Sequence, residues 1–180
     1  MANNDIAFRN GWDKFESLDL NDIKAYIVRH GDVRFIDRID KSTKEIQGAE
    51  LKIDYNESFL KDVNIDETNE FWKACKQECK NVAKLLREDK CSRQAIVDFM
   101  PISPENLPSC FVCAQFFANK KNVDMFVYMR SCDAVNKLAS DLARYCIMNK
   151  IVADLLGLKP KEITIFIGSL HIYVDDIIRK

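Results

Sequence analysis

The sequence predicts a single α+β domain, in which a mostly antiparallel β-sheet is covered by a long buried central helix and by peripheral helices. Two observations predict this class. Apolar residues follow helical spacing in some segments and alternate as in strands in others. Residues 140–160 are apolar on nearly all sides, which is typical of a helix buried against a sheet. We find neither an internal repeat nor a low-complexity linker, so we expect one domain over residues 1–180.

The first half of the chain predicts two helices with strands between them. The earlier helix covers residues 21–32, with Asn21 as its N-cap and Gly31 as its stop. Apolar residues then tend to alternate from residue 32 to residue 54, as in strands around a charged turn. The clearest amphipathic helix covers residues 66–90, and its apolar face is formed by Phe71, Trp72, Cys75, Cys79, Val82, Leu85 and Leu86.

The second half predicts four strands and the central helix. Residues 94–100 form a strand that ends at Pro101 and Pro104. Residues 109–118 and 122–130 form two strands of a hairpin joined by a polar turn. The central helix ends at Gly157 and Pro160, and a last strand occupies residues 162–176.

Composition excludes several classes of function. The 27 basic and 28 acidic residues give a net charge of −1, which argues against partners such as duplex nucleic acid or an anionic membrane surface. No apolar run is long enough to span a membrane, and the first residues do not resemble a signal peptide, so we expect a cytoplasmic protein. The odd count of seven cysteines favours reduced thiols, and two histidines without zinc spacing predict no metal site.

The stretch "LPSCFVCAQFF", residues 107–117, places Cys110 and Gln115 in a segment that otherwise predicts a buried strand. A buried strand needs neither a nucleophile nor an amide. The two residues are therefore either small core fillers or the floor of a reaction site.

Several motifs together resemble the thymidylate synthase superfamily, which includes the cytidylate hydroxymethylases. They are "LPSCFVCAQFF", "MFVYMRSCD", "GLKP" and "GSLHIYVDD", in the family's order and spacing, and "RSCD" at residues 130–133 is the most specific. "CSRQAIVDF" resembles the family's paired-arginine strand, and "DRIDKSTKEIQG" resembles its arginine loop. The resemblance implies a thymidylate synthase-like fold and a pyrimidine-nucleotide C5 transferase that is most similar to a CMP or dCMP hydroxymethylase.

The resemblance also implies roles for individual residues. Cys110 is the nucleophile that adds to C6 of the pyrimidine, and Gln115 lies below the ring. Arg38, Arg93, Arg130 and Ser131 bind the phosphate, with Asp133 as a further nucleotide-binding residue, and His171 and Tyr173 bind a sugar hydroxyl. Arg93 matches an arginine that reaches across a dimer interface, which implies a homodimer with its sheets packed back to back. Gln94 stands where the family has a second arginine.

Asp141 is the most informative position for the base. Uracil-specific members of the family carry an asparagine there, whereas cytidylate hydroxymethylases carry an aspartate. A carboxylate accepts a hydrogen bond from the N4 amino group of cytosine, and a protonated carboxyl also donates to N3. Asp141 also suits a helix N-terminus electrostatically, so it has a structural interpretation as well. We expect a cytosine nucleotide, either CMP or dCMP.

Departures from the family fall on the folate side. Near residues 60–66 the family's helical segment with a catalytic glutamate is shortened almost to nothing, and neither Glu57, Glu67 nor Glu70 matches that glutamate. Phe111 replaces a histidine, and "AVNKLAS" replaces a glycine-rich run. 5,10-Methylenetetrahydrofolate stays a candidate cofactor, although these losses argue against it. The alternatives are a folate-independent C5 reaction, or a catalytically reduced protein that binds a pyrimidine nucleotide or a partner subunit.

Overall fold

The computed structural model describes residues 5–7, 19–60, 70–98 and 110–178. Its strands are β1 (Asp5–Ala7), β2 (Asp32–Ile36), β3 (Lys41–Asp54), β4 (Ile96–Asp98), β5 (Phe111–Ala118), β6 (Asn122–Met129), β7 (Cys132–Asp133) and β8 (Lys159–Tyr173). Its helices are α1 (Leu20–His30), α2 (Glu70–Glu88), α3 (Leu138–Leu156) and α4 (Val174–Ile178), with short 3₁₀ turns η1 (Asp37–Ile39) and η2 (Glu57–Leu60). Pro101, Pro104 and the residues just before Cys110 lie outside the described part of the chain.

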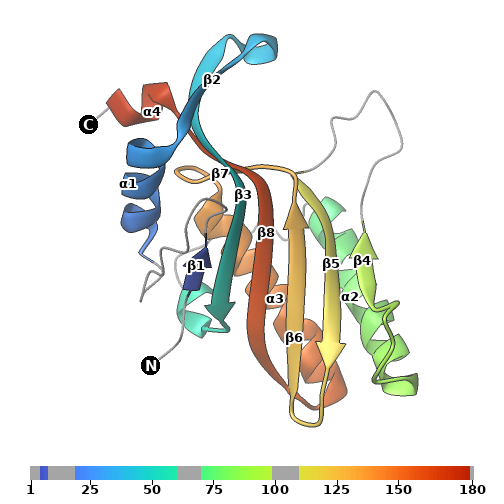
Figure 1. The fold of residues 1–180 in the computed structure, drawn as a ribbon. Helices are drawn as coiled ribbons and strands as arrows, with labels where there is room; N and C mark the ends of the chain where they lie inside the picture. The colour runs from blue at the N-terminus through green and yellow to red at the C-terminus, as the bar shows by residue number, and fades with distance from the viewer. Residues whose placement is uncertain (1–4, 8–18, 61–69, 99–109, 179–180) are drawn as a thin grey trace.

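All the described strands belong to one sheet, as Figure 1 shows. The main strand order is β1-β3-β8-β6-β5-β4. Two further strands lie off this path: β2 pairs with β3, and β7 pairs with β8. Pairing is antiparallel except where β6 and β7 run parallel to β8. The predicted α+β class with a mostly antiparallel sheet is therefore confirmed.

The long helix α3 covers one face of the sheet, with α2 beside it (Figure 1). Leu142, Cys146 and Ala153 of α3 are completely buried, and so are Ile163 and Ile165 of β8. The prediction of a buried central helix is therefore confirmed. The helix ends at Gly157, whose backbone is left-handed (φ 67°), a conformation that costs glycine little. Pro160 lies in β8, opposite Val123, and does not end the helix.

The predicted first helix corresponds to α1, but its N-cap is Asp19 and not Asn21. The Asp19 side chain accepts a hydrogen bond of 2.7 Å from the backbone N–H of Asn21, which is already inside the helix. Gly31 is the C-cap, as expected. Helix α1 packs on β3 and β8 through the fully buried Ile23 and Ile27.

Alternation along β8 positions the candidate site. Leu170 and Ile172 are buried, whereas Ser169, His171 and Tyr173 alternate with them and point to the other face. The carboxyl end of β8 thus supplies apolar groups to one side of the sheet and polar groups to the other.

The face of β5, β6 and β8 that points away from α2 and α3 carries exposed aromatic side chains. Phe117 and Phe126 meet edge to face at 5.5 Å between ring centroids, and Phe126 stacks on Phe166 at 6.5 Å. The three rings are 38 to 40% exposed. Among the described elements, α2 and α3 lie on the other side of these strands, so this aromatic face stays open to a partner.

Candidate active site

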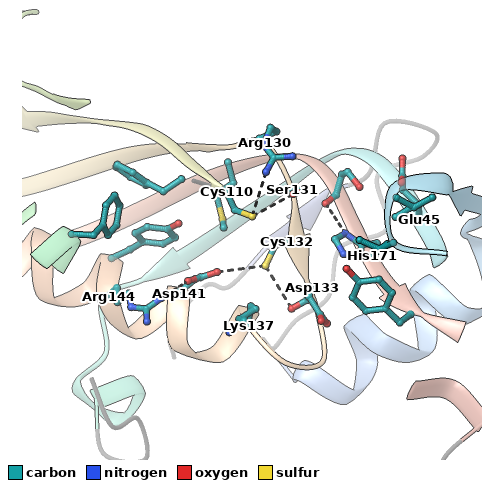
Figure 2. Close-up of a pocket in the computed structure, with 18 of the residues that line it drawn as sticks. Glu45, Cys110, Arg130, Ser131, Cys132, Asp133, Lys137, Asp141, Arg144 and His171 are labelled. Carbon is teal, nitrogen blue, oxygen red and sulfur yellow. Dashed lines mark hydrogen bonds and ion pairs between the residues drawn. The ribbon is translucent and has the colours of Figure 1, made fainter. Parts of the chain in front are cut away.

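A pocket of about 900 Å³ lies at the carboxyl ends of β6 and β8, beside the first turns of α3 and the turn η1 (Figure 2). Eight of the ten site residues expected from the sequence line it: Arg38, Cys110, Arg130, Ser131, Asp133, Asp141, His171 and Tyr173. The volume is within the range of pockets that bind small molecules. Residues far apart in the sequence therefore meet in one cavity.

Cys110 lies just before β5 and is exposed to the pocket. Its Sγ atom is 3.5 Å from Ser131 Oγ, and Arg130 Nη2 donates toward it at 3.9 Å (Figure 2). The backbone N–H of Arg130 also donates to the Cys110 carbonyl at 2.7 Å, which ties the two chain segments together. A guanidinium group at this position stabilises negative charge on the sulfur, and the thiolate is the nucleophilic form of cysteine.

The other two pocket thiols differ from Cys110 because they are buried. Burial raises the pKa of Cys75 to about 12. Burial also raises the pKa of Cys132, and the neighbouring Asp141 carboxylate adds to the shift. Both thiols therefore stay protonated at neutral pH, which leaves Cys110 as the candidate nucleophile. None of the seven cysteines is in a disulfide.

Asp141 occupies the first turn of α3 and forms an ion pair with Arg144, with 3.0 Å between Oδ1 and Nη1. Cys132 Sγ donates to its other oxygen at 3.8 Å. Burial raises the pKa of Asp141, and the Arg144 guanidinium opposes that shift. The carboxyl is thus held from two sides inside the pocket, beside Lys137 at the N-cap of α3.

Asp133 organises the loop before α3. Its Oδ1 atom accepts from the backbone N–H groups of Val135 and Asn136 at 2.9 and 3.1 Å, and Oδ2 accepts from the Asn136 side chain at 2.9 Å. This capping holds the loop at the pocket edge. In β8, Gly168 lets the backbone at Arg130 come close, because a Cβ atom at residue 168 would lie 2.7 Å from the Arg130 carbonyl oxygen.

His171 and Tyr173 lie on the same face of β8, as their spacing predicts. Their rings meet edge to face at 5.3 Å, and His171 Nδ1 is 3.4 Å from the Ser169 carbonyl oxygen. Arg38 reaches the pocket from η1, between β2 and β3. The polar groups therefore surround the pocket from at least three elements.

Arg93 and Gln115 do not line this pocket. Gln115 pairs with Ile96 and Phe126 in the sheet, and both of those residues are exposed on the aromatic face. Directly opposed residues in antiparallel strands share a face, so Gln115 points away from Cys110. Its amide donates to the Arg93 carbonyl at 2.9 Å, so the backbone of Arg93 lies beside the aromatic face.

The structure adds pocket residues that the sequence reasoning did not assign to the site. Glu45 of β3 and Lys137, Arg144 and Tyr145 around the start of α3 supply polar groups. An apolar wall is formed by Phe71, Trp72, Cys75, Phe111, Met129 and Met148. Helical spacing already grouped three of these on one face of α2, but it could not show that this face borders a cavity.

Two absences hold for the part of the chain that the structure describes. No group of His, Cys, Asp or Glu side chains within it could hold a metal ion. Neither does any of its helices have the length and apolar character needed to cross a membrane.

Comparison with known proteins identifies the family. The sequence profile described as "Thymidylate synthase" matches residues 12–179. The chain is 31% identical over 101 residues to the thymidylate synthase of Buchnera aphidicola subsp. Schizaphis graminum, covering 54% of this chain and 38% of the relative. It is 26% identical over 101 residues to the bifunctional dihydrofolate reductase-thymidylate synthase of Plasmodium chabaudi, covering 54% and 17%. The chain thus aligns with less than half the length of these relatives. Because the family profile extends over nearly the whole sequence, the chain belongs to the thymidylate synthase family.

Proposed function

We propose that this protein binds a cytosine nucleoside monophosphate and catalyses a reaction at C5 of the pyrimidine, most like that of the cytidylate hydroxymethylases. The observation that carries the proposal is the Cys110 thiol, which lies in contact with Arg130 and Ser131 in the pocket that also contains Asp141. We also take the 180 residues to form one domain.

The proposed chemistry begins with attack of the Cys110 thiolate on C6. A bond forms between Sγ and C6, and the electron pair of the C5–C6 double bond moves into an enolate-like system that makes C5 nucleophilic. C5 then forms a bond to an electrophilic carbon, and the C5 hydrogen leaves as a proton that solvent water accepts. Elimination of the thiolate from C6 restores the ring. Arg130 stabilises the thiolate at both the first and the last step.

Arg38, Arg130 and Ser131 are suited to the phosphate. The forked donors of a guanidinium group match phosphate oxygens in pairs, and a hydroxyl group adds one further donor. Arg38 comes from η1 and Arg130 from the end of β6, so the two cations approach the pocket from different parts of the sheet.

Asp141 supports cytosine as the base. Its carboxylate accepts a hydrogen bond from an N4 amino group but has no donor for the O4 atom of uracil. The adjacent Arg144 guanidinium fixes the carboxylate through a 3.0 Å contact.

The family's one-carbon donor, a reduced folate, is compatible with one wall of the pocket. Phe71, Trp72, Phe111 and Tyr145 present aromatic side chains there, which suit a planar ring system. Those residues would hold such a donor, which when bound supplies the one-carbon unit at the oxidation level of formaldehyde. A folate-independent reaction, such as exchange of the C5 hydrogen, needs none of these contacts.

We further propose a homodimer formed through the aromatic face. Phe117, Phe126 and Phe166 offer apolar area to a second copy of the chain, and apolar faces of this kind are typical of protein interfaces. Arg93 lies beside this face and outside its own chain's pocket. We propose that its side chain reaches the pocket of the partner.

A second candidate function is nucleotide binding without turnover. It is favoured by the hydrogen bonds and ion pairs that the pocket carboxylates already form with the protein. Within the described residues each of the three is engaged by protein groups: Glu45 by Arg34, Asp133 by its own loop and Asp141 by Arg144. None is left without a partner to act as a general base close to C5.

Calorimetric titration with CMP, dCMP, UMP and dUMP tests binding, and release of tritium from C5-labelled nucleotide tests turnover. We expect cytosine-selective binding that Asp141→Asn redirects toward uracil, and tritium release that Cys110→Ala abolishes while binding persists. A reduced folate added to parallel samples shows whether release depends on it. Binding without any release supports the second candidate, and absence of binding by all four nucleotides contradicts both.

A further inference from the structure

Glu45 of β3 is a pocket carboxylate to which the proposed chemistry gives no role. Its side chain is only 11% exposed, and it forms an ion pair with Arg34 of β2. Removing a carboxylate from water is costly unless it is paired. A carboxylate in a pocket wall is therefore expected to be paired by the protein, by a ligand, or by both.

One oxygen of Glu45 is held by the protein. Arg34 Nε of β2 lies 3.3 Å from Oε1, and Gln47 Nε2 donates to the same Oε1 atom at 3.1 Å. Within the described part of the chain, no hydrogen bond to Oε2 is found. The carboxylate is thus fixed through one oxygen, while the other keeps its capacity to accept.

The position of Glu45 relative to His171 is set by the sheet. The two residues are directly paired between β3 and β8, and Figure 2 shows them next to each other, apart from the group around Cys110. Directly opposed residues share a face and have Cβ atoms roughly 5 Å apart. The next pair along the same face is Thr43 with Tyr173. Glu45 therefore reaches the same part of a ligand as His171.

This part of the ligand is the sugar, if the proposed function holds. Cys110 and Asp141 take the base, and Arg38 and Arg130 take the phosphate. In a nucleotide the sugar joins these two groups. Three further polar side chains, those of His171, Tyr173 and Glu45, lie together on one wall and are suited to its hydroxyl groups.

We infer that Glu45 accepts a hydrogen bond from the 2′-hydroxyl of a ribose, so that the substrate is the ribonucleotide CMP and not dCMP. An ionised carboxylate only accepts, and a hydroxyl group is its natural donor. His171 and Tyr173 then contact the neighbouring 3′-hydroxyl. A deoxyribose offers no donor at the 2′ position, so the desolvated Oε2 atom of Glu45 loses a partner.

The test is the ratio of the dissociation constants of dCMP and CMP, measured by calorimetry. We expect CMP to bind more tightly to the wild-type protein by roughly tenfold to a hundredfold, the effect of one charge-assisted hydrogen bond. Glu45→Ala should bring the ratio close to one, and Glu45→Gln should give an intermediate ratio. His171→Ala should weaken both nucleotides while CMP stays the tighter ligand.

The matched control is Arg34→Met, which removes the ion pair but keeps the carboxylate. If Glu45 only neutralises Arg34, both Glu45→Ala and Arg34→Met change folding stability and leave the ratio of the wild type unchanged. If the wild-type protein binds CMP and dCMP equally, the inference is overturned but the proposed function stands. If it binds neither nucleotide, both fail. Thermal melting of each variant identifies any that do not fold.

Discussion

Arg130 Nη2 lies 3.9 Å from Cys110 Sγ, and the backbone of the same arginine donates to the Cys110 carbonyl. One residue thus both positions the thiol and places a positive charge beside it. The backbone bond fixes the position of Cys110 directly before β5, while the side chain stabilises negative charge on its sulfur. The two effects are separable, because a substitution at Arg130 removes the side chain and leaves the backbone N–H in place.

We predict that Arg130→Met slows alkylation of Cys110 by iodoacetamide by roughly threefold, as expected when the positive charge beside an exposed sulfur is lost. Arg130→Lys should retain part of the rate because it keeps the positive charge. Mass spectrometry of the peptide containing Cys110 measures the rate. Cys91, which is also exposed, is the internal reference. Equal rates in the wild type and in Arg130→Met would rule out activation by this arginine.

The second prediction concerns the pH dependence of stability. Burial raises the pKa of Asp141 above its usual value of 3.8, against the opposing effect of Arg144. The folded protein therefore binds this proton more tightly than the unfolded chain does. The contribution of Asp141 to the free energy of unfolding is therefore fully present below about pH 3.8, the pKa in the unfolded chain. It is lost as the pH rises through the pKa in the folded protein.

Asp141→Asn has no carboxyl group that titrates at this position. As the pH rises from about 3.8 to the folded-state pKa of Asp141, the free energy of unfolding of the variant should therefore increase relative to that of the wild type. Above that pH the difference between the two proteins should stay constant. Urea unfolding at a series of pH values gives the free energies. Arg144→Met should widen the interval, because the guanidinium lowers the pKa of Asp141. A wild-type protein that gains stability over Asp141→Asn with rising pH would show the opposite sign and contradict the burial argument.

The third prediction tests the aromatic face. Phe126→Glu puts a charge among Phe117, Phe166 and their counterparts in a second copy, so we expect a monomer by light scattering. The matched control, Lys80→Glu, puts the same side chain on the exposed surface of α2 and should leave the oligomeric state unchanged. A dimer that survives Phe126→Glu would place the interface elsewhere.

Mixing two variants tests whether Arg93 acts across that interface. Arg93→Ala and Cys110→Ala should each lack tritium release. After random exchange of subunits, half of the dimers combine the two chains and hold one intact site, so about one quarter of the sites should recover. If Arg93 acts within its own chain or not at all, mixing restores nothing beyond the sum of the separate samples.

Periodicity predicted the long elements α2, α3 and most of β8, because each has apolar residues at the spacing that burial requires. It did not predict the short elements β1, β7 and α4. The last strand was expected over residues 162–176, but β8 is Lys159–Tyr173, and residues 174–176 form the first turn of α4. The N-cap of α1 was predicted wrongly as Asn21, because Asp19 and Asn21 both suit that position and only the start of hydrogen bonding distinguishes them. Such one- or two-residue differences are common at helix ends.

Gln115 shows what motif matching leaves out. A bulge between Phe111 and Cys113 brings Phe111 and Ala114 to the helix-covered side, and Gln115 then follows on the other side. The role of Glu45 depends on β3 pairing with β8 in one particular register, and no local pattern in the sequence specifies the register of distant strands. The motifs predicted eight of the polar residues that line the pocket. The other lining residues could be identified only from the folded structure.

The pairing of β3 with β8 has a consequence for how the protein folds. It joins Thr43 near the start of the described chain to Tyr173 near its end, in the middle of the sheet order. Contacts between such distant segments form slowly, because the entropy of closing the long intervening loop is lost before the contacts stabilise the chain. Arg38, Glu45 and His171 come together only once that pairing exists. A nucleotide added during refolding should therefore leave the folding rate unchanged and slow unfolding, since it binds only after the central strands have met.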